Sequence, residues 1–376
     1  MTTKSGVGLF PSHQAPRFAV QGWLASRLVL LITVLVLVYQ RGWSINEPFS
    51  RWDAAHFIHL STHGYTQATE AAFFPGLPGI MALFALIGIP AFLTGIIVSL
   101  VGSAMAAWAL YRLAGGGVPG AVAVLAWSFA PMAVFTFVPY TESVFLAFAL
   151  WSFWYAKRDQ WGWAGVLAGA SCLFRISGLF LIGALGLIAL FGFSGSTWKR
   201  RMTRVAWLGI PMAVLGLYSF YLRVRFGSWM AWFQAQGEGW GRHFDWPWNG
   251  LIVTLKAAGI IGSKMHVSGV IFRWEFAVFL VGLIVVVACF SRRWIAEGGW
   301  VGVQWLALSC QAWFISMTRS FLLWFPVFLL IAQFAKPDLP RAVNDFRRGG
   351  FIALVSLEIS TMIWWAHRYY VGAWAG

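Results

Sequence analysis

Residues 18–39 read FAVQGWLASRLVLLITVLVLVY, an apolar run long enough to cross a bilayer, which takes roughly 20 residues as a helix. The 17 residues before it are polar, and no small-residue cleavage site follows, so the run is predicted to be a retained first span. The chain is 60% hydrophobic and 10% charged, against about 25% charged residues in a soluble domain. The sequence therefore predicts an integral membrane protein.

Further apolar stretches follow along the chain, several of them only about 15 residues long, which a bundle or a thinned bilayer tolerates. The interval 76–89, which ends before Pro90, is predicted to be a short interfacial or re-entrant helix, because the crossings between Arg41 and Arg112 must be odd in number. We therefore expect an all-α polytopic protein, a single membrane domain over residues 1–376 with about eleven transmembrane helices. The apolar stretches lie at 18–39, 91–111, 118–138, 140–156, 161–174, 177–193, 204–222, 267–290, 300–317, 320–335 and 350–367.

The distribution of basic residues predicts an orientation. Fifteen of the 27 Lys and Arg residues fall at the N-terminus or in alternate short loops, as the positive-inside rule requires for the cytoplasmic side. The C-terminal end of the chain is then predicted to be outside. These basic residues are Lys4, Arg17, Arg112, Lys157, Arg158, Lys199, Arg200, Arg201, Arg204, Arg292, Arg293, Lys336, Arg341, Arg347 and Arg348.

The net charge of +15 does not indicate nucleic-acid binding, because the sequence has no long solvated basic segment. Cys172, Cys289 and Cys310 are isolated within apolar runs and are read as packing residues. The 25 Trp and 33 Phe suit the headgroup level of a membrane, where amphipathic rings collect. We therefore expect the protein to contact membrane lipids and not nucleic acid.

Two loops on the predicted outer side, at 40–75 and 223–266, are too long for tight turns and too aromatic for free linkers. In the first, Asp53 follows Trp52 and precedes a helical pattern. A carboxylate partly desolvated there gains basicity and could act as general base for a sugar hydroxyl, with Glu142 as the reserve candidate. The alternative, which the loop leaves equally open, is a solvated aspartate that caps a helix.

His56, His59 and His63 share one helical face and could suggest a metal site. Gly64 ends that helix, however, and no acidic ligand follows at a fixed spacing, so interfacial hydrogen bonding is the expected role. We predict neither a metal nor a cofactor.

Four polar insertions lie at the predicted outer ends of spans, and they contain Glu142, Arg175, Arg319 and Arg368. Charges near a bilayer are costly and usually functional or paired. Because the nearby acids are too few to neutralise all outer basic residues, the arginines are predicted to converge on a phosphate, with Lys264 in reserve. The alternative is that Glu142 pairs with an arginine only to lock the bundle.

Several segments, in order, resemble the motifs of the PIG-V mannosyltransferases, the GPI mannosyltransferase II type within the GT-C superfamily. The resemblance covers about residue 45 to the C-terminal end of the sequence. The usual Thr-Arg-Pro motif of the family stands here as Phe174-Arg175-Ile176, which departs from it on both sides of the arginine. The segments are Trp52-Asp53 with His56-Phe57, Gly64-Tyr65, Phe73-Phe74-Pro75, Tyr140-Thr141-Glu142-Ser143, Phe174-Arg175 with Ser177-Gly178-Leu179, Gln234 with Trp240, Pro247-Trp248, and Arg319 before Phe325-Pro326.

The resemblance implies a GT-C bundle with surface helices in the first outer loop. It also implies an inverting transfer of mannose from a polyprenyl-phosphate donor to a glycolipid or other lipid-linked acceptor, with an acidic residue of the first outer loop, here Asp53, as the catalytic one. The substrate-binding candidates are Trp52, His56, His59, Tyr140, Gln234, Trp240 and Trp248.

The sequence has no Asn-x-Ser/Thr sequon and is rich in Ala, Gly and Trp, which favours a bacterial plasma membrane over the ER. The resemblance implies an active site on the extracytoplasmic side. A polytopic lipid or glycolipid transporter or flippase is the alternative function, although no internal repeat is visible. A non-catalytic membrane subunit is a third reading.

Overall fold

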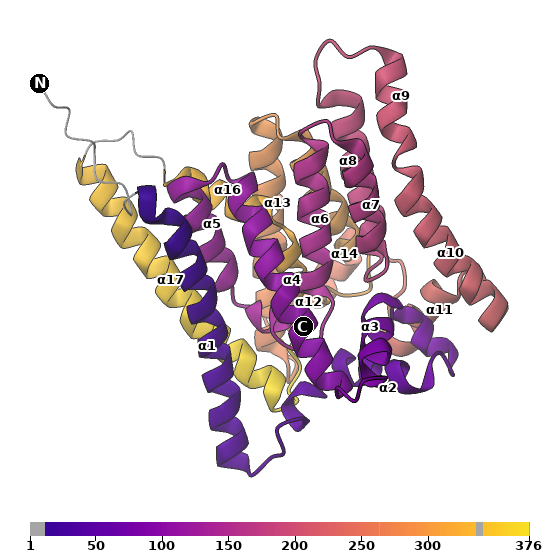
Figure 1. Ribbon diagram of the computed structural model, residues 1–376. Coiled ribbons are helices and arrows are strands. Elements are labelled where there is room, and N and C mark those ends of the chain that lie inside the picture. Colours follow the sequence, from indigo (N-terminus) through magenta and orange to yellow (C-terminus); the bar gives the residue numbers. More distant parts are fainter. Residues whose placement is uncertain (1–11, 263, 336–340, 376) are drawn as a thin grey trace, which may run out of the picture.

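A computed structural model describes residues 12–262, 264–335 and 341–375 (Figure 1). Within these ranges the chain is built from helices, and its only β-pairing is a single bridge between Phe244 and Gln311. The predicted all-α class is therefore confirmed. Lys4 and Lys336, two of the basic residues used to predict the orientation, lie outside the described residues.

Five segments are long and apolar enough to cross a membrane by length and composition. They are α1 (Ala15–Arg41), α4 (Ala91–Leu113), the run Trp198–Phe226 formed by α9 (Trp198–Ala206) and α10 (Gly209–Phe226), α13 (Gly269–Ser291), and Gly349–Tyr370 within α17 (Arg341–Tyr370).

The other apolar stretches form shorter helices, so the number of crossings, eleven, stays a prediction. These helices are α5 (Gly117–Ser128), α6 (Glu142–Ala156), α7 (Trp161–Cys172), α8 (Ser177–Phe191), α14 (Ile295–Ser309) and α16 (Pro326–Gln333).

Close helix contacts are made through small residues. A Cβ atom added to Gly102 on α4 would lie 2.7 Å from the backbone nitrogen of Val144 on α6. Lipid-embedded helices gain little from apolar burial and instead pack where small side chains let their backbones approach. This approach places the beginning of α6, and with it Glu142, close against α4.

Helices from the two long loops lie at the lower right of Figure 1, together with the short helix that follows the first loop. There α2 (Asp53–His63), α3 (Gly76–Ala85) and α11 (Ala231–Trp240) lie together, whereas α9 lies at the opposite end. The loop 223–266 also contains α12 (Pro247–Ala257). At 1.5 Å per residue α3 is about 15 Å long, which is half of a hydrocarbon core.

Short helical turns connect these elements and complete the architecture. They are η1 (Ser12–Gln14), η2 (Glu47–Phe49), η3 (Ala68–Ala72), η4 (Ala133–Thr136), α15 (Met317–Ser320) and η5 (Phe321–Leu323).

Candidate active site

Five charged residues from five separate segments meet at the end of the bundle that carries α2 and α11. Asp53 begins α2 and Glu142 begins α6. Arg319 lies on α15, and two more arginines lie in connections, Arg175 before α8 and Arg242 after α11. We call these five residues the charged cluster.

Ion pairs join the two carboxylates of the charged cluster to two of its arginines. Arg319 Nη1 donates to Asp53 Oδ2 at 2.8 Å, and its Nε lies 3.2 Å from Glu142 Oε1. Arg175 Nη1 donates to the same Glu142 oxygen at 2.6 Å. Glu142 is almost completely buried, with 1% of its surface exposed. The expected shortage of acids therefore does not leave Arg175 and Arg319 unpaired, because both share Glu142.

Arg242 differs from the other two arginines because its partner is neutral. Its Nη2 donates to Ser316 Oγ at 3.1 Å, while its buried Nε has no hydrogen-bond partner among the residues that the structure describes. Burial lowers the pKa of Arg242 to about 10, and the positive charge of Arg319 acts in the same direction. The side chain still carries its charge at neutral pH. The sequence analysis did not identify Arg242 as a candidate. The one indication of a role is its position in the loop 223–266.

The backbone that presents Asp53 is strained. Trp52 has φ of 54°, which is rare for a bulky residue and persists only where its surroundings enforce it. Tyr140 accepts a hydrogen bond from the Asp53 amide at 3.2 Å, and the Tyr369 hydroxyl donates to the Arg51 carbonyl at 3.2 Å. These two tyrosines, which are far apart in the sequence, therefore hold the peptides on both sides of Trp52.

The helix-cap alternative for Asp53 is wrong. The N-cap position of α2 is Trp52, and no side chain caps this helix. The carboxylate of Asp53 instead faces Arg319.

A buried acid, Glu275 on α13, supports the segment that carries Arg319. Its Oε2 accepts from the amides of Met317 and Thr318 at 2.8 and 3.2 Å, and its Oε1 accepts from the Thr318 hydroxyl at 2.8 Å. Sequence reasoning missed Glu275 too, although an acidic residue within an apolar span is a usual sign of function or pairing.

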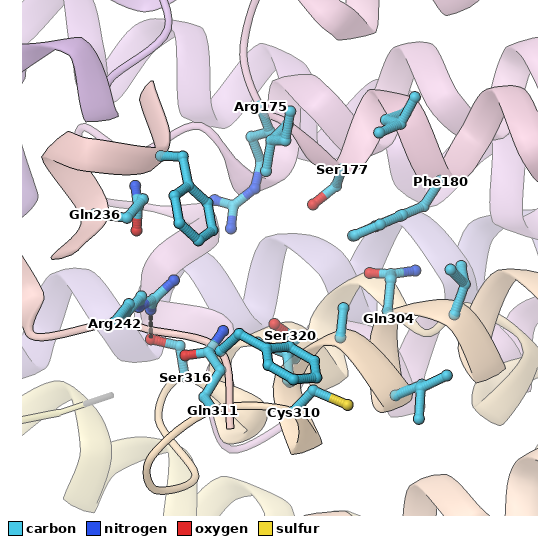
Figure 2. A pocket seen from close by; sticks show the side chains of 18 of the residues that line it. Arg175, Ser177, Phe180, Gln236, Arg242, Gln304, Cys310, Gln311, Ser316 and Ser320 are labelled. Carbon is cyan, nitrogen blue, oxygen red and sulfur yellow. Dashed lines mark hydrogen bonds between the residues drawn. The ribbon is translucent and has the colours of Figure 1, made fainter. Parts of the chain in front are cut away.

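Three adjoining cavities of about 580, 110 and 90 Å³ surround the charged cluster, and all three are lined by Arg242 and Arg319. Arg175 lines the two larger ones, and Asp53 lines the two smaller ones. We call them the large, middle and small cavities. Figure 2 shows Arg175, Gln236 and Arg242 around one end of the large cavity.

The large cavity becomes apolar away from the charged cluster. Its far end, where Phe180 and Gln304 lie (Figure 2), adjoins a groove of about 610 Å³ that shares Phe180, Leu179 and Val303 with it. The groove runs between α8 and α14 and has several glycines in its wall. The polar end of the large cavity is therefore connected, through the apolar far end of that cavity, to the apolar groove.

The three histidines of α2 make ordinary side-chain contacts. His59 Nε2 lies 3.1 Å from Glu70 Oε1, and the rings of His59 and His63 stack at 4.4 Å. His56 stacks on Phe73 at 4.8 Å. In the described parts of the chain no group of three His, Cys, Asp or Glu side chains is arranged to hold a metal ion.

The structure brings some of the predicted binding residues to the cavities. Trp52 and Tyr140 line the small cavity, and Trp240 lines both the middle and the small one. His56 lies beside this wall, with its ring 6.2 Å from that of Trp240.

Other candidates lie away from the cavities. Gln234 is exposed, and Gln236 lines the large and middle cavities in its place. Trp248 is exposed and stacks on Trp246 at 5.0 Å. Lys264 is exposed, and Arg368 donates two hydrogen bonds to the Trp374 carbonyl.

Comparisons with known proteins agree with the motifs. A curated relative, the GPI alpha-1,6-mannosyltransferase 2 of Mus musculus, is 29% identical to the chain over 188 residues. The resemblance to the PIG-V mannosyltransferases is thereby confirmed. The aligned part is 45% of this chain, and the chain spans only 38% of the length of that mannosyltransferase. No family model matches the chain.

Among solved structures, the crystal structure of ArnT from Cupriavidus metallidurans bound to undecaprenyl phosphate can be superposed on 94% of this chain and 75% of that one. The TM-score is 0.49 and the sequence identity is 12%.

Proposed function

We propose that this chain is a membrane glycosyltransferase of the inverting type, which transfers mannose from a polyprenyl-phosphate donor to a glycolipid or lipid-linked acceptor. We further propose that it lies in a bacterial plasma membrane with the charged cluster on the extracytoplasmic face. One observation carries the proposal. The carboxylate of Asp53 is paired with Arg319, which together with Arg175 and Arg242 lines the end of a cavity that continues into an apolar groove.

The donor phosphate is assigned to the point where the large and middle cavities meet. Arg175, Arg242 and Arg319 line both cavities there. These three cations face two carboxylates, Asp53 and Glu142, so the cluster carries one uncompensated positive charge. Arginine forks match phosphate oxygens in a bidentate manner. A phosphate monoanion would neutralise the cluster and give the free Nε of Arg242 a partner.

The lipid tail of the donor is assigned to the groove between α8 and α14. Gly183 on α8 lines this groove, and no heavy atom lies within 4 Å of a Cβ built on it. An isoprenoid chain is apolar and flexible, so a groove lined by apolar side chains and several glycines accommodates it. The groove begins at Leu179 and Phe180, which also line the large cavity, so headgroup and tail can occupy connected spaces.

The chemical step follows from the position of Asp53. Its Oδ2 is held by Arg319, and no donor in the described residues is hydrogen-bonded to Oδ1. We assign Oδ1 to accept the proton of the acceptor hydroxyl. The hydroxyl oxygen then forms a bond to the anomeric carbon, the bond from that carbon to the phosphate oxygen breaks, and the phosphate leaves with the electron pair.

The arginines neutralise the charge that develops on the leaving phosphate, so the proposed reaction needs no divalent metal. Glu142, the reserve base of the sequence analysis, accepts from Arg175 and lies within ion-pair distance of Arg319. We assign it to orient these two arginines.

The proposal is tested with purified protein, synthetic polyprenyl phosphate mannose and a panel of lipid acceptors. The expected result is mannose transfer that inverts the anomeric configuration. Transfer from a nucleotide sugar but not from the mannosyl lipid would contradict the donor assignment.

A further inference from the structure

We propose that the small cavity is the subsite for the acceptor's sugar ring, and that Arg368 shapes it by holding the segment after α17 as one of its walls. The proposal rests on the proposed function for the role of Asp53, which lines this cavity. It gives Arg368 a role different from donor phosphate binding.

The segment after α17 is folded back against the site. Arg368 donates to the Trp374 carbonyl through Nε at 3.0 Å and Nη2 at 2.9 Å. Gly372, at φ of 76°, allows the chain to reverse direction. The ring of Trp374 packs edge-on against Phe272 of α13 at 5.3 Å. These contacts place Trp374 and Ala375 in the wall of the small cavity.

The lining of the small cavity suits a neutral saccharide. Its walls include the aromatic side chains of Trp52, Tyr140, Trp240, Tyr369 and Trp374. Aromatic rings offer flat apolar faces to the C–H side of a sugar ring, while a few placed polar groups fix its hydroxyls. Asp53 and Ser316, which also line this cavity, supply those polar groups. The acceptor class is therefore a glycolipid or lipid-linked glycan that ends in an uncharged sugar.

The position of the small cavity relative to the donor fits an inverting displacement. Arg175 lines the large cavity but not the small one. Asp53 lines the small cavity but not the large one. Arg242 and Arg319 separate the two. A hydroxyl that enters through the small cavity meets Asp53, and we assign it to attack the anomeric carbon from the side opposite the phosphate, as inversion requires.

The test compares acceptor and donor KM in Arg368→Ala, Trp374→Ala and Trp374→Phe. Removal of the Trp374 ring, or of the Arg368 side chain that holds its segment, is expected to raise the acceptor KM roughly 2-fold to 12-fold and to leave the donor KM unchanged. Trp374→Phe keeps an aromatic face and is expected to stay within about 2-fold of wild type.

Two variants serve as matched controls. Arg273→Ala also removes a guanidinium bonded to a backbone carbonyl, that of Ala258, and Trp229→Ala removes an exposed tryptophan. Neither residue lines any of the three cavities, so both KM values should stay at the wild-type level.

A binding measurement that needs no turnover completes the test. Saturation-transfer NMR with methyl α-D-mannopyranoside, methyl α-D-glucopyranoside and myo-inositol is expected to show at least one ligand whose signal is lost in Trp374→Ala and kept in Trp229→Ala.

The outcomes separate the two proposals. Suppose that the saccharide signal is present in wild-type protein and Trp229→Ala, is lost in Trp374→Ala, and wild-type protein transfers no mannose. The proposed function is then wrong, and the saccharide subsite is supported. An unchanged acceptor KM in a folded Trp374→Ala variant, or no Trp374-dependent ligand, overturns the subsite. A raised donor KM in Arg368→Ala with an unchanged acceptor KM would instead indicate that Arg368 contributes to donor binding.

Discussion

Removing Arg242 should weaken donor binding more selectively than removing any other arginine of the charged cluster. Its side chain bonds only neutral Ser316 among the described residues, so Arg242→Ala leaves no carboxylate unpaired. Arg319→Ala, by contrast, takes a partner from both Asp53 and Glu142. Breaking a buried ion pair in this way costs on the order of 3–5 kcal/mol of stability. Loss of Arg242 should therefore leave the protein folded.

The expected magnitude follows from the lost phosphate contact. One charge-assisted hydrogen bond contributes about 1.5–3 kcal/mol, which corresponds to a donor KM roughly 10-fold to 150-fold higher in Arg242→Ala. Arg242→Lys keeps the charge without the planar fork and should lie between wild type and alanine. The acceptor KM should not change by more than about 2-fold, because the assigned contact is with the leaving phosphate.

The assay is a donor titration of initial rates on protein whose melting temperature matches wild type. Arg225→Ala serves as control, because Arg225 bonds the Tyr65 carbonyl and lines none of the three cavities. An unchanged donor KM in folded Arg242→Ala would refute the assignment of the phosphate to this arginine.

Three more predictions concern the donor. Arg175→Lys should show donor use between that of wild type and Arg175→Ala, and equal values for lysine and alanine would argue against a bidentate phosphate contact. Treatment with EDTA should leave activity unchanged, and loss of activity with rescue by manganese or magnesium would contradict charge neutralisation by arginine alone. Gly183→Leu fills the groove and should raise the KM of long-chain donors but not of a short-chain analogue. Gly216→Leu, on α10 and also with no atom within 4 Å of its Cβ, is the control, and equal effects of both variants would remove the tail assignment.

Much of the fold could be predicted from hydropathy alone. Each predicted apolar stretch contains a helix, because a chain in lipid must satisfy its backbone polar groups within a helix. The number of crossings, about eleven, stays a prediction. Helices such as α7 and α16 are shorter than a lone span requires, and packing within the bundle decides their placement.

The site was predictable where charge interrupts apolar sequence. Asp53, Glu142, Arg175 and Arg319 stand out for this reason, and the structure brings all four together. Their pairing was not predictable, since Asp53 and Arg319 are 266 positions apart and meet only through tertiary packing. Arg242 could not be recognised as a site residue, because a single arginine in a hydrated loop is common in protein sequences.

Helix phase explains why Gln236 and not Gln234 lines the cavities. Two residues along a helix rotate a side chain by about 200°, so Gln234 and Gln236 point to nearly opposite sides of α11. The family order placed a glutamine in this segment, but only the fold shows that Gln236 faces the cavities.

The central claim, that Asp53 is the general base of a mannosyl transfer, is tested most directly by the turnover of Asp53→Asn with polyprenyl phosphate mannose at saturating donor and acceptor. Asparagine keeps the shape of the side chain and removes its basicity, so turnover should fall about 100-fold or more in folded protein. Asp245→Asn is the control, because Asp245 bonds Asn249 and lines none of the three cavities. Near-wild-type turnover in Asp53→Asn, with its melting temperature preserved, would contradict the account.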